Sequence, residues 1–250
     1  MVLWNLDDPG TALKAKVEQA VETYGKLSCR AICEPFPTKL PRELRDEVYD
    51  LLVGEAGPAL MKSLMWTLNY NAKDIPFRSE TVQLRFIANP DFVSQPVAKE
   101  IAEQWYRKMR FGIRHHEFEQ FTRYDAWGQG LKPAELVNHV QIAVDERDCE
   151  LLRGRLVLLR RFKPSCRVII WIRSNSLYWD RDYAWSDQKS ERLIEGLEPL
   201  IRGLRECNDA GRNLEVWWGY NDQRRVDLTI VECSKDGWLK KIREVRAKRP

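Results

Sequence analysis

The sequence predicts an α/β (or α+β) protein in which a mainly helical part precedes a small, mainly parallel sheet with packed helices and an antiparallel edge hairpin. Strand-like apolar runs alternate with helical stretches after residue 134: 139–144, 167–172 and 213–220. That spacing suits right-handed parallel crossovers. A further run follows the turn after residue 220 and returns as a hairpin partner over 225–232. We therefore expect a part at 1–130 and an α/β part at 131–250, or one continuous domain.

The part at 1–130 is predicted to be mainly helical because apolar residues recur there every three or four positions. Such stretches lie at 11–25, 41–53, 59–68, 97–109 and 115–124. Asp7-Asp8-Pro9 precedes the first helix, and we expect Gly25 to end it. Pro35 and Pro37 favour a loop over 29–39. Two strands are also expected here: an alternating one at 81–87 and a short one at 111–113.

The second part follows a predicted loop at 125–133 that contains two glycines. Its helices are expected over 147–162, 186–207 and 235–247. The strand at 167–172, RVIIWI, has no charge after its first residue. We expect it to be buried on both faces, as central parallel strands are.

Composition narrows the class of protein. The chain has 250 residues, of which 44% are hydrophobic and 31% charged, and this balance excludes a disordered chain. Its apolar runs fall short of the roughly 18 residues that a membrane helix needs, and the N-terminus lacks the features of a secretory signal. We expect a cytoplasmic and/or nuclear protein that does not bind a membrane.

The motifs that carry catalysis or cofactor binding are missing from the sequence. It has neither of the glycine-rich phosphate-binding patterns and no nucleophile elbow. Its six cysteines show no zinc-ligand spacing, and we expect them to be reduced and mostly buried. Asp145, Glu146, Asp148 and Glu150 follow a strand end, where they either begin a helix or hold a cation. We expect no metal, no cofactor and no enzyme.

An aromatic segment joins the strand at 167–172 to the next helix. Loops of this kind often carry binding function, and Tyr, Trp and Arg are favoured at interfaces. Its candidate binding residues are Arg173, Tyr178, Trp179, Arg181, Tyr183 and Trp185. Three interpretations stay open: packing on the core, a protein-binding surface, or stacking against nucleic acid.

A basic tail carries the net positive charge of the chain. The whole chain has a net charge of +4, and residues 240–250 alone contribute +5. The basic residues are Lys240, Lys241, Arg243, Arg246, Lys248 and Arg249. The tail is either a solvated last helical turn or a phosphate-contacting or nuclear-localisation segment. In both cases we expect its removal to cost little stability.

The segment LPRELRDEVYDLL, residues 40–52, resembles the F-box-like opening of a large group of filamentous-fungal proteins. Their signature is Leu-Pro-x-Glu-Leu-Arg-x-x-Ile/Val-Tyr-x-x-Leu. VAKEIAEQWYRKMRF (97–111) and LVNHVQIAV (136–144) are similar to the helix and strand that follow in that group. The resemblance covers about residues 38–145, and Trp66 is a counterpart of the tryptophan that ends an F-box.

An F-box resemblance implies binding of a Skp-type adaptor within a cullin ubiquitin ligase. The residues that would carry this role are Leu40, Pro41, Leu44, Val48, Leu51 and Leu52. The alternative is that the same side chains pack internally, as on any amphipathic helix.

The leading functional hypothesis is a non-enzymatic protein-interaction module, in its specific form an F-box-like substrate receptor. The main alternative is a nucleic-acid-associated factor that uses the basic tail and the aromatic loop. A third is an enzyme with an acidic site at 145–150.

Overall fold

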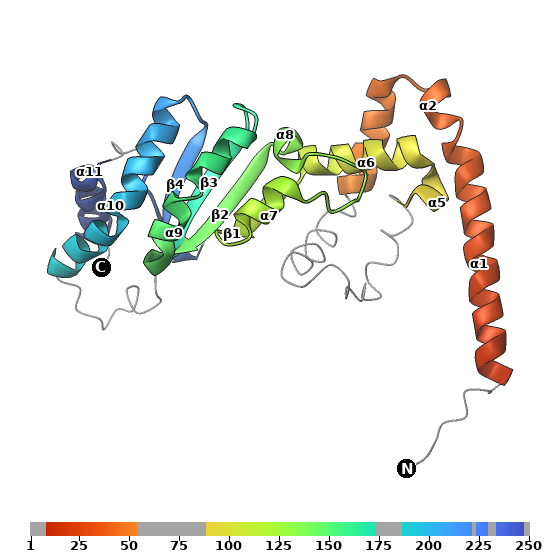
Figure 1. Cartoon of the computed structure of the whole chain (residues 1–250), viewed down its shortest axis with the longest axis horizontal. Helices are drawn as coiled ribbons and strands as arrows, with labels where there is room; N and C mark the ends of the chain where they lie inside the picture. The colour runs from red at the N-terminus through yellow and green to blue at the C-terminus, as the bar shows by residue number, and fades with distance from the viewer. Residues whose placement is uncertain (1–8, 55–88, 174–186, 222–223, 230–233, 248–250) are drawn as a thin grey trace, which may run out of the picture. The chain divides into compact units, whose positions relative to one another are not determined.

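The computed structural model describes residues 9–54, 89–173, 187–221, 224–229 and 234–247 (Figure 1). The chain forms two compact units that divide between Trp105 and Tyr106. We call the described residues up to Trp105 the helical unit and those from Tyr106 onward the sheet unit. The division lies earlier than the expected boundary at residue 130, because the strand at 110–114 pairs into the sheet.

The described residues of the helical unit form five helical segments. They are α1 (Pro9–Cys33), α2 (Phe36–Lys39), a helix over 42–54, α5 (Pro90–Val93) and most of α6 (Gln95–Lys108). The helix at 42–54 and α6 were predicted within two residues of their observed ends. The helix predicted over 59–68, the strand over 81–87 and Trp66 lie outside the described residues.

Helix α1 is longer than predicted. It passes through Gly25 and ends at Cys33, just before Pro35. An interior glycine costs a helix about 1 kcal/mol relative to alanine, but it keeps the backbone hydrogen bonds, so it does not stop one. The prediction of a loop over 29–39 was also wrong. This stretch holds the last turns of α1, which continues past Gly25, and the short helix α2.

The sheet unit contains a five-stranded sheet of order β1-β2-β3-β4-β5. The strands are β1 (Arg110–Arg114), β2 (His139–Asp145), β3 (Arg167–Arg173), β4 (Leu214–Asn221) and β5 (Arg224–Asp227). β1 to β4 are parallel and β5 is antiparallel to β4. The predicted α/β class, the mainly parallel sheet and the antiparallel edge hairpin are therefore confirmed. β5 is shorter than the predicted run at 225–232, part of which lies outside the described residues.

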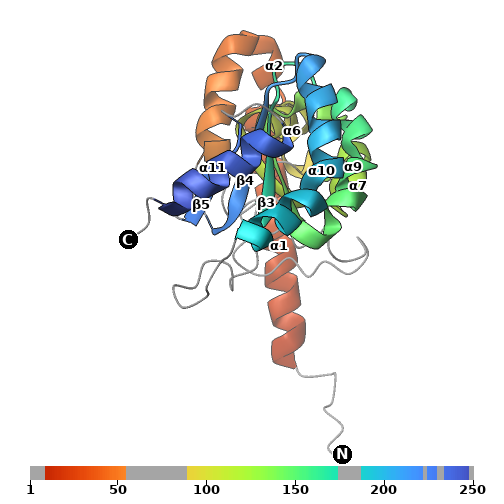
Figure 2. The ribbon, with the colours of Figure 1, turned by 90° about the vertical axis from the view of Figure 1, so that its left-hand side faces the viewer.

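One face of the sheet packs against helices. Figures 1 and 2 show α7 (Phe118–Arg123), α9 (Cys149–Arg153) and α10 (Asp187–Asp209) on the same side of the strands. On that side the sheet buries the alternate residues of neighbouring strands: Val140, Ile142 and Val144 from β2, and Val168, Ile170 and Ile172 from β3. The residues between them are mostly half-buried. β3 is thus not buried throughout as expected: Ile169 is buried, but Trp171 is only half-buried.

The connection between β1 and β2 contains the predicted glycine loop. The Asp125 carboxylate accepts hydrogen bonds from the backbone N–H groups of Trp127, Gln129 and Leu131. Gly128 and Gly130 have φ values of 63° and 70°, which suit glycine best. The loop is thus an ordered turn built around one aspartate.

The helix predicted over 147–162 is broken into three pieces. They are the 3-10 helix η2 (Glu146–Asp148), α9, and the 3-10 helix η3 (Leu156–Arg161). The break falls at Gly154, after which the Arg155 N–H bonds to the Leu152 carbonyl in a 3-10 pattern. Gly203 of α10 packs so closely there that an added Cβ would lie 2.7 Å from Leu156 Cδ1. The broken helix and α10 therefore pack tightly over the sheet.

The last helix, α11 (Lys235–Ala247), confirms the prediction for 235–247. Trp238 and Ile242 are fully buried, and α11 contacts α10. The reason for expecting the tail to contribute little stability, that it would bury little, was therefore wrong, because the fully buried Ile242 lies within it. Among the described helices, none combines the length and apolarity that crossing a membrane requires.

Candidate functional site

The helix at 42–54 holds most of the segment that resembles an F-box opening, and one of its faces packs against α6. The side chains on this face are Arg45, Tyr49 and Val53, spaced four residues apart. Tyr49 and Val53 are only 1% and 2% exposed. The helix therefore buries an arginine and a tyrosine where an ordinary amphipathic helix would bury aliphatic residues.

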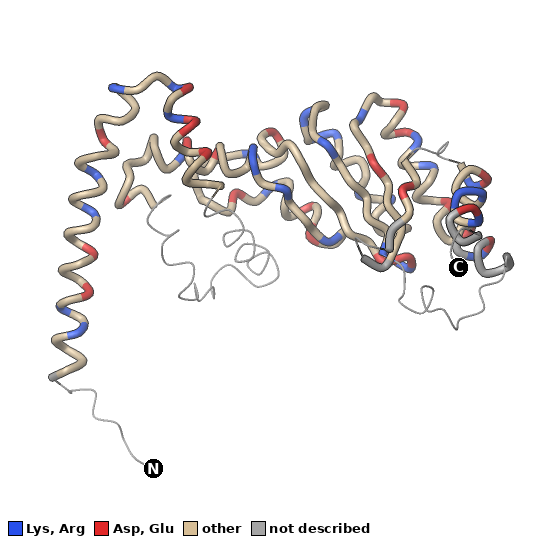
Figure 3. The backbone as a smooth tube through the Cα atoms, turned by 180° about the vertical axis from the view of Figure 1, so that it is seen from behind, with Lys and Arg blue, Asp and Glu red and all other residues tan. Residues whose placement is uncertain are grey.

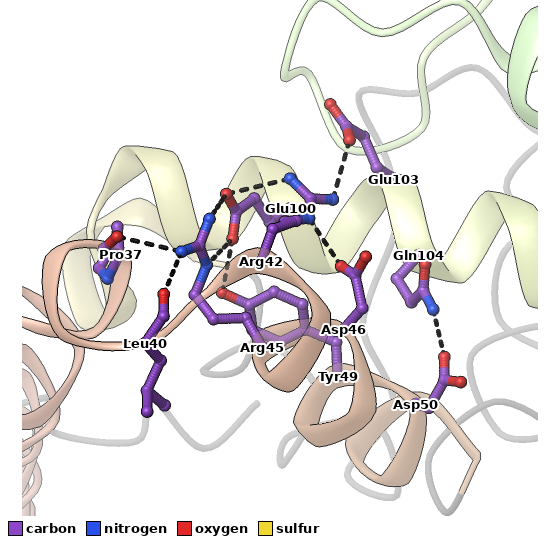
Figure 4. Close-up of polar contacts among 10 residues, drawn as sticks. All are labelled: Pro37, Leu40, Arg42, Arg45, Asp46, Tyr49, Asp50, Glu100, Glu103 and Gln104. Atoms are coloured by element: carbon purple, nitrogen blue, oxygen red, sulfur yellow. Dashed lines mark hydrogen bonds and ion pairs between the residues drawn. The ribbon is translucent and has the colours of Figure 1, made fainter.

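Glu100 of α6 is the centre of this contact (Figure 4). Arg45 binds it through two parallel hydrogen bonds, Nη2 to Oε1 at 2.8 Å and Nε to Oε2 at 2.9 Å. The Tyr49 hydroxyl donates to Oε2 at 2.9 Å, and Arg42 Nη1 lies 3.0 Å from Oε1. Such bidentate, charge-assisted contacts are directional, so they set the orientation of the helix on α6.

The same arginine also joins the helix to the preceding turn. Arg45 Nη1 donates to the carbonyl oxygens of Pro37 at 3.0 Å and Leu40 at 2.6 Å. Two further polar contacts continue along α6: Arg42 with Glu103 at 3.3 Å, and Gln104 with Asp50. Phe36 of α2 lies against Tyr49 with ring centroids 6.0 Å apart. The helix at 42–54 is thus held at both ends and in the middle.

This environment changes the acidity of Glu100, which is half-buried, and of Tyr49, which is buried. Burial alone would raise the pKa of Glu100, but hydrogen bonds from Arg45 and Tyr49 and the charge of Arg42 lower it below its usual value. Burial and the hydrogen bond to Glu100 raise the pKa of Tyr49. Glu100 is therefore ionised and Tyr49 is neutral at physiological pH.

A second face of the helix, beside the first, is apolar and exposed. It consists of Leu44, Val48, Leu51 and Leu52, which we call the leucine face. Leu44 is 48% exposed and Leu51 is 72% exposed. Pro41 is exposed and Leu40 is half-buried at the start of the helix. Five of the six residues that the resemblance assigns to adaptor binding are therefore exposed, and the alternative of internal packing is wrong for them.

Sequence reasoning missed the residues that hold this helix in place. Arg45 and Tyr49 are both fixed positions of the signature and lie four residues apart. That spacing would have indicated a shared face. Their partner Glu100 lies 55 positions from Arg45, and no local pattern connects the two.

The aromatic loop can be located only at its first residue. Arg173 ends β3, and its guanidinium lies 3.0 Å from the carboxylate of Asp145. Tyr178, Trp179, Arg181, Tyr183 and Trp185 lie outside the described residues. The hypothesis of a recognition loop therefore stays a prediction.

Part of the basic tail belongs to the packed helix α11. Lys240 is exposed, Lys241 is half-buried, and Arg243 forms an ion pair with Glu191 at 3.1 Å. Arg246 lies in α11, while Lys248 and Arg249 lie outside the described residues. The tail is thus more than a solvated appendage, and one of its charges is already paired.

The acidic residues after β2 have structural partners. Glu146 accepts a hydrogen bond from Trp218 Nε1 at 2.8 Å, and Glu150 pairs with Arg153 at 3.0 Å. Together with the ion pair between Asp145 and Arg173, these contacts favour the helix-start interpretation over a cation site. Within the described ranges, no group of three His, Cys, Asp or Glu side chains could hold a metal ion.

The cysteines are less buried than expected. Cys149 and Cys166 are buried, which raises their pKa values to about 12 and about 11. Cys29, Cys33 and Cys207 are half-buried, and all five are free. Cys233 lies outside the described residues.

The half-buried face of the sheet is the other surface with binding chemistry. Trp171 and Trp217 are register neighbours on β3 and β4, as in a base-stacking platform. The arginines beside them are neutralised, because Arg167 pairs with Glu215 and Arg173 with Asp145. Figure 3 shows acidic and basic residues interspersed along the described chain. Such a surface lacks the concentrated positive charge that phosphate binding requires.

The chain matches no family model, no curated protein and no solved structure.

Proposed function

We propose that this chain is a protein-interaction module whose partner binds across the leucine face of the helix at 42–54. The partner is a Skp-type adaptor, as the F-box-like signature implies. The observation that carries the proposal is the distribution of the two faces. Arg45 and Tyr49 bind Glu100 within the helical unit, whereas the leucine face of the same helix is exposed.

The leucine face has the properties of a binding hot spot. Four large aliphatic side chains lie on one side of a helix at spacings that a groove can engage together. The contacts between Arg45, Tyr49 and Glu100 fix the helix beforehand, so binding would lose little conformational freedom. Preorganisation of this kind favours affinity without a large interface.

The rim of the leucine face indicates the chemistry of its partner. Glu43 and Glu47 are exposed, and each directly precedes a residue of the face. A complementary partner surface would be apolar at its centre and basic at its edge. Nucleic acid does not fit this description, because its phosphates would lie against the carboxylates of Glu43 and Glu47 and against aliphatic side chains.

Titration calorimetry of the full chain against a purified Skp-type adaptor tests the proposal. The variants Leu44→Asp and Leu51→Asp should each weaken binding at least about tenfold, since truncating a hot-spot residue costs about 2 kcal/mol or more. The matched control is Leu151→Asp, which places the same change on an equally exposed leucine of α9. The control should bind as the parent does.

Two results would count against the proposal. If the parent chain does not bind the adaptor, the identity of the partner is wrong. If both variants bind as tightly as the parent, the leucine face is not the contact. Binding of single-stranded RNA with a steep salt dependence would instead support the nucleic-acid alternative.

A further inference from the structure

Helix α1 carries a second apolar stripe that its own unit leaves exposed. The stripe consists of Leu13, Val17, Ala20, Tyr24, Leu27 and Ala31, which we call the α1 seam. Its successive spacings are 4, 3, 4, 3 and 4 residues, the heptad pattern of a coiled coil, with Val17 at an a position and Leu13 at a d position. All six side chains are exposed, and the four largest are between 54% and 74% exposed.

The contacts of α1 within the helical unit come from a different flank. Phe92 of α5 lies under Gly25, where an added Cβ would be 3.5 Å from its ring. Lys26 lies over the same ring, 5.5 Å from its centroid, and 3.6 Å from Asp91. Gly25 and Lys26 occupy heptad positions b and c, so α5, which lies beside α1 (Figure 1), contacts α1 next to the seam. Tyr24 and Leu27 of the seam stay exposed there.

The first half of α1 has little to stabilise it within one chain. Every side chain from Gly10 to Tyr24 is exposed. A helix of this length is marginal in water unless an apolar face is buried against something. An exposed stripe in a strict heptad pattern requires another helix of the same period.

We infer that the α1 seam pairs with the same seam of a second copy of this chain, in a parallel two-stranded coiled coil. An identical helix matches the seam in length and in period, and a two-fold axis lets each seam residue meet its equivalent. The a positions are Val17, Tyr24 and Ala31, and the d positions are Leu13, Ala20 and Leu27. The β-branched Val17 at a, with leucine at two of the three d positions, favours two parallel strands.

The positions beside the seam permit this arrangement. In a parallel pair, a g residue faces the e residue five positions later on the partner helix. Lys16 would face Val21, and Thr23 would face Ser28. These pairings bring no like charges together. The leucine face belongs to another helix, so this inference does not depend on the proposed function.

Light scattering coupled to gel filtration of the full chain tests the inference. The parent should have twice the monomer mass of 29.5 kDa. Val17→Asp should reduce it to the monomer and lower the helical circular dichroism signal, because α1 would lose its packing. The matched control is Ala15→Asp, which changes an exposed alanine of the same helix at an f position and should stay dimeric.

Disulfide cross-linking reports the arrangement without disrupting it. Leu13→Cys places a thiol at a d position, where a parallel in-register pair brings the two copies into disulfide range. Lys14→Cys, one position off the seam, should cross-link far less. A monomeric parent, an unchanged dimer in Val17→Asp, or equal cross-linking at positions 13 and 14 would overturn the inference.

Discussion

Strand β3 and the helix at 42–54 each carry a row of aliphatic residues on one face, but β3 buries its row and the helix exposes most of its own. β3 lies between two hydrogen-bonded neighbours and buries Val168, Ile170 and Ile172 under the helices of its own unit. The helix at 42–54 exposes Leu44, Val48 and Leu51. The difference shows that an apolar stripe on a helix does not by itself identify a core.

The reason lies in what each element packs against. A strand projects its side chains alternately to the two faces of the sheet, and in β3 helices cover the face that carries Val168, Ile170 and Ile172. A helix can turn either face toward its neighbour, and here α6 offers the ionised carboxylate of Glu100. Arg45 and Tyr49 pair with that carboxylate better than aliphatic side chains would, so the aliphatic face points outward.

The largest expected effect is at β3. Ile170→Asp would place an unpaired charge in the core, which costs at least several kcal/mol out of a total stability of about 5–15 kcal/mol. We expect no soluble, cooperatively folded protein, as judged by circular dichroism and thermal melting. Ile170→Val, the conservative control, should cost about 1 kcal/mol. A cooperative melt of the Asp variant near the parent temperature would contradict the burial of β3.

A smaller but clear loss is expected in α11. Ile242→Ala removes a fully buried side chain, and such changes cost about 2–5 kcal/mol. Urea unfolding followed by tryptophan fluorescence measures it. Lys240→Ala, two residues away on the exposed side, should stay within about 0.5 kcal/mol of the parent. Equal stability of the two variants would mean that the tail is solvated after all.

The next largest expected loss of stability comes from removing the hydroxyl of Tyr49. Tyr49→Phe removes one hydrogen bond to Glu100 while Arg45 still pairs with it, so the free energy of unfolding should fall by about 1 kcal/mol. The matched control is the same change in a Glu100→Ala background, where the Tyr49 hydroxyl has no carboxylate to donate to. Tyr49→Phe should lower stability in urea unfolding in the parent and much less in the Glu100→Ala background.

Acid should weaken the helical unit through Glu100. The pKa of Glu100 is lower in the folded protein than its usual value of 4.5. Its contribution to stability is therefore complete above that value and is lost as the pH falls through the lower, folded-state pKa. Melting temperatures measured from pH 7 downward should fall less steeply in this acid range for Glu100→Gln than for the parent. Identical pH profiles would show that Glu100 contributes no such linkage.

The smallest expected effect is on the leucine face. Leu44→Asp should change the free energy of unfolding by no more than about 0.5 kcal/mol, since the side chain is exposed and the helix is held from its other face. Thermal melting of this variant, compared with Ile170→Asp, tests the contrast directly. Loss of folding in Leu44→Asp would show that the leucine face is part of a core.

The sequence identified the residues of the leucine face but not the contacts that leave them exposed. Leu44, Val48, Leu51 and Leu52 could be identified from the signature because it is a local pattern. Glu100 could not, since its importance depends on which residues of the helix at 42–54 face α6. The aromatic loop was equally visible in the sequence, and its role stays a prediction.

By itself, the sequence determined the α/β class, the parallel arrangement of β2 to β4, the antiparallel β5 and the positions of α6, α10 and α11, but not that β1 joins the sheet. These features follow from periodicity and from the spacing of the crossovers, which are local or nearly local properties. Only the tertiary structure decided that α1 continues through Gly25, that the units divide at Trp105, and which face of the helix at 42–54 is buried. Those outcomes depend on contacts between residues far apart in the chain, and the free energy of such a contact is set by both surfaces together.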